Sequence, residues 1–292
     1  MEDFARSDLA CEQKDIANAT SSEEQVRHVG FVTVRSVTAE PKNAGSGRYI
    51  TLECGNLAKT EEDEELLCRV IAGELAGLAK RLTGKEAGDL SVFVAGLGNA
   101  SLTADAIGPE TVARLTVTRH LREYEPHLYQ DLACSAISAL APGVLGQTGI
   151  ETLEILRGTV RAVKPDLVIV IDALAARSCS RLASTIQISD TGITPGSGVG
   201  NHRMGIDRET LGVPVIALGV PTVVDSATLV WDALQEAGIG EISDSLRKVL
   251  EQGRSFFVSP KESDRLTRRV AEILSRSIGL AFADKLFDGA MS

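Results

Sequence analysis

Apolar residues with two different spacings follow one another along this chain and predict alternating strands and helices. The runs at 93–96 and 167–171 are short and unbroken, as expected for strands buried on both faces of a sheet. Residues 61–82 and 149–163 instead carry their apolar side chains at helical spacing. This alternation through the centre of the chain indicates right-handed crossovers and a parallel sheet.

The remaining apolar blocks extend the same pattern. We expect further strands over 31–38, 48–53, 134–139, 184–189 and 213–219, and further helices from 108, over 226–237, over 241–250 and from 259. The predicted fold class is α/β, a mostly parallel sheet with helices on both faces and with terminal extensions. A single domain over 9–292 accounts for the pattern, with 9–47 as an N-terminal extension and 259–292 as a C-terminal helical addition.

Composition narrows the class of protein. The chain has 292 residues, a formal net charge of −10 and 43% hydrophobic residues. The acidic balance gives no basic footprint, so we expect no direct nucleic-acid binding. No apolar run approaches the roughly 18 residues of a membrane span, and the N-terminus lacks the apolar core of a secretory signal. The five scattered cysteines are typical of reduced cytoplasmic thiols, and Cys179 has no histidine near it in sequence to make it a nucleophile.

Acidic residues follow two of the predicted buried strands. Asp105 comes after the strand that ends in Gly-Leu-Gly-Asn at 96–99, and Asp172 directly follows 167–171. The carboxyl ends of parallel strands meet at one edge of a sheet, where clefts form. We therefore expect the two carboxylates to share a cleft and to perform acid–base chemistry on a polar bond. The alternatives are a helix N-cap for Asp105 and a salt bridge with Arg177 for Asp172.

Glycine-rich segments flank these acids. Gly96 and Gly98 lack the third glycine and the later strand-end acid of a dinucleotide fingerprint, so we expect them to line the cleft with Asn99. Asp190-Thr-Gly matches a motif of pepsin-like proteases but occurs once, in an α/β pattern, so a loop role beside the cleft is preferred.

The later glycine-rich loop at 194–201 lacks the Lys-Ser/Thr ending of a P-loop. We expect its Gly196 and Gly198 to line or gate the cleft, with an ordinary surface turn as the alternative.

The same segments resemble the germination protease family of endospore-forming bacteria. The similarity runs through 96–121, 138–152, 165–201 and 211–228, with 7–12 matching near the start. Its longest blocks are Ile169-Val-Ile-Asp-Ala-Leu-Ala-Ala-Arg-Ser178 and Thr185-Ile-Gln-Ile-Ser-Asp-Thr-Gly-Ile-Thr-Pro-Gly-Ser-Gly-Val-Gly-Asn201. Blocks of this length cover most of the middle of the chain and are far more specific than a short motif.

This resemblance implies both a function and its residues. The family's two essential aspartates lie in the motifs that match around Asp105 and Asp172. The family's precursor cuts itself in a segment similar to 7–12, which maps the cut to Asp8–Leu9 and makes 1–8 the propeptide; a frayed terminus without a role is the alternative. The resemblance further implies a tetrameric endopeptidase of the spore core that degrades small acid-soluble spore proteins after an acidic residue. The fold so implied is a three-layer sandwich of the phosphorylase/hydrolase-like kind.

Metal chemistry is the main alternative for the site. Gly-x-Gly-Asn followed by an acid is also similar to the hydrogenase-maturation endopeptidases, which hold nickel with carboxylates and a histidine. His120, His127 and His202 lie in other contexts, and Asp225 at another strand end is a candidate oxygen ligand instead. We expect a metal-free aspartate pair without a cofactor; a metal-dependent peptidase and a non-catalytic peptide- or anion-binding module remain as alternatives.

An aspartate pair divides its work through protonation. One carboxylate is ionised and activates a water, while the other is protonated and polarises the carbonyl or protonates the leaving amine. Nothing in the sequence assigns these two roles. Backbone N–H groups near Gly98-Asn99 are expected to stabilise the oxyanion.

Overall fold

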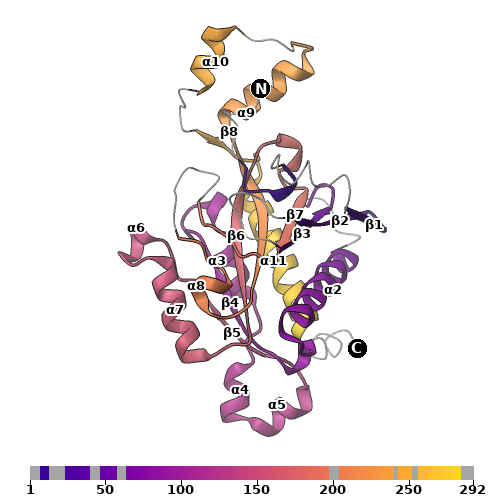
Figure 1. Ribbon diagram of the computed structural model, residues 1–292, viewed down its shortest axis with the longest axis vertical. Helices are drawn as coiled ribbons and strands as arrows, with labels where there is room; N and C mark the ends of the chain where they lie inside the picture. Colours follow the sequence, from indigo (N-terminus) through magenta and orange to yellow (C-terminus); the bar gives the residue numbers. More distant parts are fainter. Residues whose placement is uncertain are drawn as a thin grey trace.

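The fold is described from a computed structural model of the chain (Figure 1). The structure describes residues 7–12, 24–39, 47–57, 64–196, 204–239, 243–251 and 256–283. Strands in these ranges form one nine-stranded sheet in the order β1-β2-β3-β7-β8-β6-β4-β5, with β9 paired to β8. The strands are β1 (Gln25–Val29), β2 (Val32–Ala39), β3 (Gly47–Glu53), β4 (Ser91–Gly96), β5 (Ala136–Leu140), β6 (Leu167–Ala176), β7 (Thr185–Ser189), β8 (Val215–Asp225) and β9 (Phe257–Val258).

The sheet is mixed, which corrects the expectation of a mostly parallel one. The β4–β5, β4–β6 and β6–β8 pairs are parallel, and the other described pairs are antiparallel. The strands β1, β2 and β3 follow one another as an antiparallel meander that joins the parallel part through β7. Antiparallel strands can be joined by a two-residue turn, as β1 and β2 are, whereas parallel strands need longer crossovers. The stretch expected as an N-terminal extension therefore supplies β1 and β2 of the main sheet.

Helices cover both faces of the parallel part, as the alternating pattern predicts (Figure 1). One face packs against α2 (Glu64–Thr83), α3 (Ile107–Arg114) and α11 (Ser263–Phe282), and the other against α7 (Thr152–Val163). The short helices are α4 (Arg119–Tyr124), α5 (Pro126–Leu132), α6 (Leu145–Thr148) and α8 (Arg208–Leu211), and the 3-10 turns are η1 (Ala10–Glu12), η2 (Ala87–Asp89), η3 (Thr103–Asp105) and η4 (Cys179–Arg181). The helix expected from residue 259 begins at Ser263, and its buried residues belong to the main hydrophobic core.

Side chains of the central strands alternate between the two faces, and this alternation positions the site. On β6, Ile169 and Ile171 belong to the core under α2 and α11, while Val168 and Val170 belong to the core under α7. Because successive side chains of a strand point to opposite faces, Asp172 lies on the α7 face. The strand therefore delivers this carboxylate at the end of its fully buried stretch.

An arm projects beyond the sheet at the carboxyl end of β8. It consists of α9 (Ser226–Glu236) and α10 (Asp244–Glu251), after which β9 returns to pair with β8 (Figure 1). The strand β8 extends beyond residue 219, where the sequence predicted its end. It continues past Gly219 and Pro221, and its pairing with β6 shifts register there.

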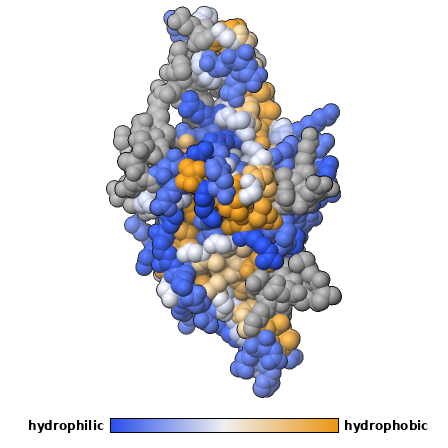
Figure 2. All heavy atoms as spheres, turned by 90° about the vertical axis from the view of Figure 1, so that its right-hand side faces the viewer, coloured by the Kyte–Doolittle hydropathy of each residue, from blue (hydrophilic) through white to orange (hydrophobic). Residues whose placement is uncertain are grey.

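Polar residues dominate the described surface in Figure 2, with smaller apolar patches between them. None of the helices in the described ranges has both the length and the apolar character that a membrane crossing requires.

Candidate active site

A cleft of about 640 Å³ opens where β4 and β6 end, and it contains both aspartates that the sequence singles out. Asp105 and Asp172 line it together, as expected for acids at the carboxyl ends of neighbouring parallel strands. The cleft is lined by Asp8, Leu97, Gly98, Leu102, Thr103, Ala104, Asp105, Val144, Thr152, Asp172, Ala173, Leu174, Ala175, Pro195, Gly196, Thr222, Val223 and Phe257. Most of these residues are apolar, and Asp8, Asp105 and Asp172 are the charged residues of the lining.

Asp105 is held by the loop that follows β4. Its Oδ2 accepts a hydrogen bond from the backbone N–H of Asn99 at 2.8 Å. The helix α3 has Ala106 as its N-cap and no side-chain cap, so the N-cap alternative for Asp105 is wrong. The Asn99 N–H is committed to Asp105, which also corrects its expected role as an oxyanion donor.

Glycine is required at two positions of this loop by close backbone contacts. Gly98 has φ +112°, and a Cβ there would lie 2.0 Å from the carbonyl oxygen of Asp105. A Cβ on Gly96 would lie 2.2 Å from the carbonyl oxygen of Gly108, where α3 begins. Gly98 therefore lines the cleft and shapes it, whereas Gly96 lies behind it and lets α3 approach β4.

Asp172 is buried at the floor of the cleft. Its side chain and backbone together are 6% exposed, and its Oδ1 accepts a hydrogen bond from the N–H of Ala173 at 3.0 Å. Asp172 pairs in register with Gly219 of β8. The carboxylate is therefore fixed by a central strand rather than by a mobile loop.

The N-terminal segment 7–12 lies across this cleft. The N–H of Asp8 donates to the carbonyl oxygen of Ala175 at 2.9 Å, and the Oδ2 of Asp8 accepts from the N–H of Ala175 at 2.9 Å. Leu9 is fully buried in an apolar pocket with Leu174 and Val224. Burial of a leucine side chain stabilises by about 2 kcal/mol, so Leu9 anchors the segment.

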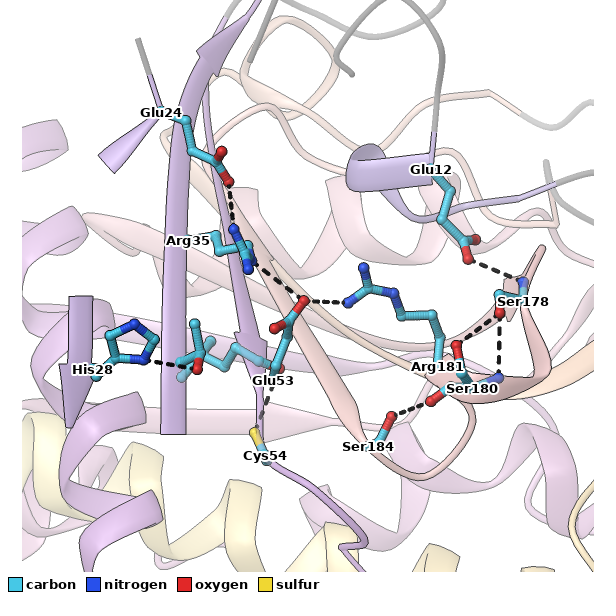
Figure 3. A network of polar contacts seen from close by, with 12 residues as sticks. Glu12, Glu24, His28, Arg35, Glu53, Cys54, Ser178, Ser180, Arg181 and Ser184 are labelled. Atoms are coloured by element: carbon cyan, nitrogen blue, oxygen red, sulfur yellow. Dashed lines mark hydrogen bonds and ion pairs between the residues drawn. The ribbon is translucent and has the colours of Figure 1, made fainter. Parts of the chain in front are cut away.

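Glu12 is a second anchor of the segment. Its carboxylate accepts hydrogen bonds from the N–H groups of Arg177 at 2.6 Å and Ser178 at 3.0 Å. Figure 3 shows Glu12 directed at Ser178, beside the ion pairs that Arg181 and Arg35 make with Glu53. The hydrogen bonds from these two N–H groups to one carboxylate are charge-assisted, and such bonds are about twice as strong as neutral ones.

Other residues predicted to line the cleft lie elsewhere. Asp190 accepts a hydrogen bond from the N–H of Arg48 at 2.7 Å and pairs with Arg81, so it ties the end of β7 to β3 and α2 rather than lining the cleft. Asn99 contacts Asp105 but is not among the lining residues. Gly196 lines the cleft as expected, while Gly198 and residues 1–6 of the predicted propeptide lie outside the described residues.

Two features of the site were missed from the sequence. The pocket for Leu9 and the contacts of Gln187 with the N-terminal segment join residues more than 160 positions apart. A signal for Gln187 exists in hindsight: it is the polar residue between Ile186 and Ile188, on a strand whose other face is buried. Such a position places a polar side chain on the face of the site.

The donor groups near the cleft bear on metal binding and on thiol chemistry. Among the described residues, no three His, Cys, Asp or Glu side chains are grouped as metal ligands would be. Asp225, the candidate oxygen ligand, instead caps α9 by accepting from the N–H of Ala227 at 2.8 Å. Burial, together with Asp232, raises the pKa of Cys179 to about 11, so this thiol stays protonated at neutral pH.

Two carboxylates in one cleft, with a segment of peptide chain lying across it, are an arrangement suited to peptide hydrolysis. The germination protease family model (Peptidase_A25) matches residues 2–237. The chain therefore belongs to the germination protease family and is an endopeptidase.

Two germination proteases of other bacteria are similar to this chain over most of their length. The germination protease of Caldanaerobacter subterraneus subsp. tengcongensis is 41% identical over 320 residues, which cover 98% of this chain and 97% of that protein. The germination protease of Clostridium acetobutylicum is 42% identical over 263 residues, covering 82% and 80% of the two chains. Among solved structures, the [NiFe] hydrogenase maturation protease HycI from Thermococcus kodakarensis matches with 19% identity and a TM-score of 0.37, covering 70% of this chain and 98% of that one.

Proposed function

We propose that this endopeptidase is made as a self-processing precursor that cuts itself between Asp8 and Leu9. The mature enzyme then degrades small acid-soluble spore proteins during germination, cutting after an acidic residue and before an apolar one. It works in the cytoplasm of the spore core as a homotetramer, without direct contact with nucleic acid or membrane. Residues 1–8 are the propeptide, and 9–292 form one peptidase domain.

The observation that carries this proposal is the position of Asp8. Its side chain lines the same cleft as Asp105 and Asp172, and its N–H is bound to Ala175 on β6. The residue after it, Leu9, is buried in its own apolar pocket. An acid in the cleft followed by a buried aliphatic residue is the pairing expected of a substrate cut between the two.

Asp105 and Asp172 are the catalytic pair in this proposal. One carboxylate is ionised and removes a proton from the attacking water, and the other is protonated and donates to the leaving amine. In this mechanism the pair shares one proton, because two like charges close together resist joint ionisation. No metal ion and no cofactor takes part in this mechanism.

A cleavage assay tests the substrate assignment. Purified protein is incubated with a small acid-soluble spore protein, with and without EDTA, and the products are identified by mass spectrometry. We expect cuts between an acidic and an apolar residue, at equal rates in both arms.

Each other outcome contradicts part of the proposal. Cuts at unrelated positions would overturn the specificity, and loss of cutting in EDTA would assign the site to a metal-dependent peptidase. Binding of the spore protein without any cut would leave a non-catalytic peptide-binding module.

A further inference from the structure

Gln187 contacts both sides of the bond between Asp8 and Leu9. Its Oε1 accepts a hydrogen bond from the N–H of Ala10 at 2.6 Å, and its Nε2 donates to the carbonyl oxygen of Asp8 at 3.4 Å. A backbone N–H only donates and a carbonyl oxygen only accepts, so these two partners fix the orientation of the side-chain amide. The NH₂ group therefore points at the carbonyl of the bond proposed for cleavage.

The sheet places Gln187 opposite Asp172. Gln187 on β7 and Asp172 on β6 both pair in register with Gly219 on β8, the strand between them. Residues in register on neighbouring strands point to the same face, so both side chains rise from the α7 face. Two strand spacings separate their Cα atoms by about 10 Å, enough for a peptide bond to lie between the two side chains.

An apolar floor supports the peptide bond at this place. Leu174 lies over Gly219, with its Cδ1 2.4 Å from where a Cβ of Gly219 would stand. Leu9 packs against Leu174 from above. Leu9 therefore holds the segment against the sheet, on the face from which both Asp172 and Gln187 rise.

We propose that Gln187 is a further catalytic residue, which stabilises the oxyanion formed at the scissile carbonyl. This inference rests on the proposed cut between Asp8 and Leu9. Water adds to the carbonyl carbon and its proton passes to the ionised carboxylate, while the electron pair of the C=O double bond moves onto the carbonyl oxygen. The Gln187 amide donates to that oxygen. When the C–N bond breaks, the Leu9 nitrogen takes the proton of the second carboxyl and the C=O bond re-forms.

The chemistry of an amide suits this role. A glutamine NH₂ has no titratable proton at the pH values where the carboxylates exchange theirs, so it donates throughout the reaction. Donors aimed at developing negative charge are worth most where water is excluded. The hydrogen bond of 3.4 Å is long in this state, and such bonds tighten as charge develops on the oxygen.

Kinetics of Gln187 variants test this proposal. The self-processing rate is measured by intact mass, and kcat and KM are measured on a synthetic peptide of residues 4–14. Gln187→Glu keeps the shape of the side chain and the oxygen that accepts from the Ala10 N–H, but it replaces the NH₂ group that faces the Asp8 carbonyl with an oxygen. Gln187→Ala removes both the acceptor and the donor. Gln235→Glu is the matched control, because it makes the same substitution at an exposed glutamine of α9 whose Nε2 donates to the carbonyl oxygen of Ile239 and which does not line the cleft. Melting temperatures verify that each variant is folded.

We expect both Gln187 variants to lower kcat by about 100-fold or more, which is the loss found when one oxyanion donor is removed. Gln187→Glu keeps the acceptor for the Ala10 N–H, so its KM should change little. The Gln235→Glu control keeps its kcat. Folded Gln187 variants with a kcat near that of the wild type, or with a raised KM alone, would overturn the role of Gln187 while the proposed cut stands. Absence of any cut by the wild-type protein would instead overturn the proposed function together with this inference.

Discussion

Individual residues around Asp105 show how the backbone determines the site. The Gly98 backbone adopts a conformation that L side chains rarely take, and it brings the Asn99 N–H onto the Asp105 carboxylate. The Gly-x-Gly-Asn motif therefore positions a carboxylate. The sequence predicts the acid and the glycines, whereas the reason for each glycine depends on contacts with residues 105 and 108.

Replacement of Gly98 tests this explanation. Gly98→Ala introduces a Cβ that meets the Asp105 carbonyl oxygen and strains the backbone, a cost of about 1–3 kcal/mol for the conformation alone. We expect a melting temperature several degrees lower and loss of self-processing, measured by calorimetry and intact mass. Gly84→Ala is the control, since Gly84 also has a positive φ but nothing lies within 4 Å of its Cβ position. Normal processing by Gly98→Ala would show that the loop does not set the position of Asp105.

Elements with strong periodicity were the ones that the sequence predicted well. The strands β4 and β6 and the helices α2 and α7 appear near their expected bounds, because buried apolar runs leave a clear pattern. The strand β1 was missed because its residues are almost all exposed, and β9 has only two residues. Asp190 was misplaced because its ion pair with Arg81 joins elements that are far apart in sequence.

The docked segment 7–12 provides a prediction for a single element. Glu12→Gln removes the charge that two N–H groups hold, so the segment docks less firmly and self-processing should slow by about tenfold. The measurement is a time course of intact mass at mildly acidic pH. Glu24→Gln serves as the control, because Glu24 pairs with Arg35 and not with the segment. An unchanged rate in Glu12→Gln would mean that this anchor does not present the scissile bond.

The whole molecule brings the site together from distant parts of the chain. The segment 7–12, the loop after β4, the end of β6 and the strand β7 each supply groups to one cleft or its peptide. The two aspartates were predictable because each follows its own strand. The contact between the segment 7–12 and β6 was not predictable, because it depends on long-range packing of Leu9 that leaves no local pattern.

Stability of the whole fold should persist at mildly acidic pH. Burial acts to raise the pKa of Asp166, but Lys85 and the Ser91 N–H outweigh it and hold this pKa below its usual range. Burial likewise acts to raise the pKa of Glu53, but Arg181 and Arg35 hold that pKa below its usual range. A carboxyl with a lowered pKa in the folded state stabilises above its unfolded pKa, and this stability is lost as pH falls through the folded pKa. We expect a nearly constant melting temperature from neutral pH down to about pH 5 and a decline below about pH 4.

Thermal unfolding followed by circular dichroism across this pH range measures the effect. In Lys85→Met, which removes a group that lowers the pKa of Asp166, the melting temperature should be lower at neutral pH and should decline less below about pH 4, because Asp166 then contributes less stability to lose. A steep decline in the wild type between neutral pH and about pH 5.5 would contradict the account, because these carboxylates are still ionised there.

Self-processing of matched aspartate variants tests the central claim most directly. Wild type, Asp105→Asn and Asp172→Asn are purified, incubated side by side at mildly acidic pH with and without EDTA, and followed by intact mass spectrometry. The aspartate-pair account predicts loss of residues 1–8 in the wild type in both arms, and no loss in either variant. Near-normal processing by Asp105→Asn or by Asp172→Asn would contradict it.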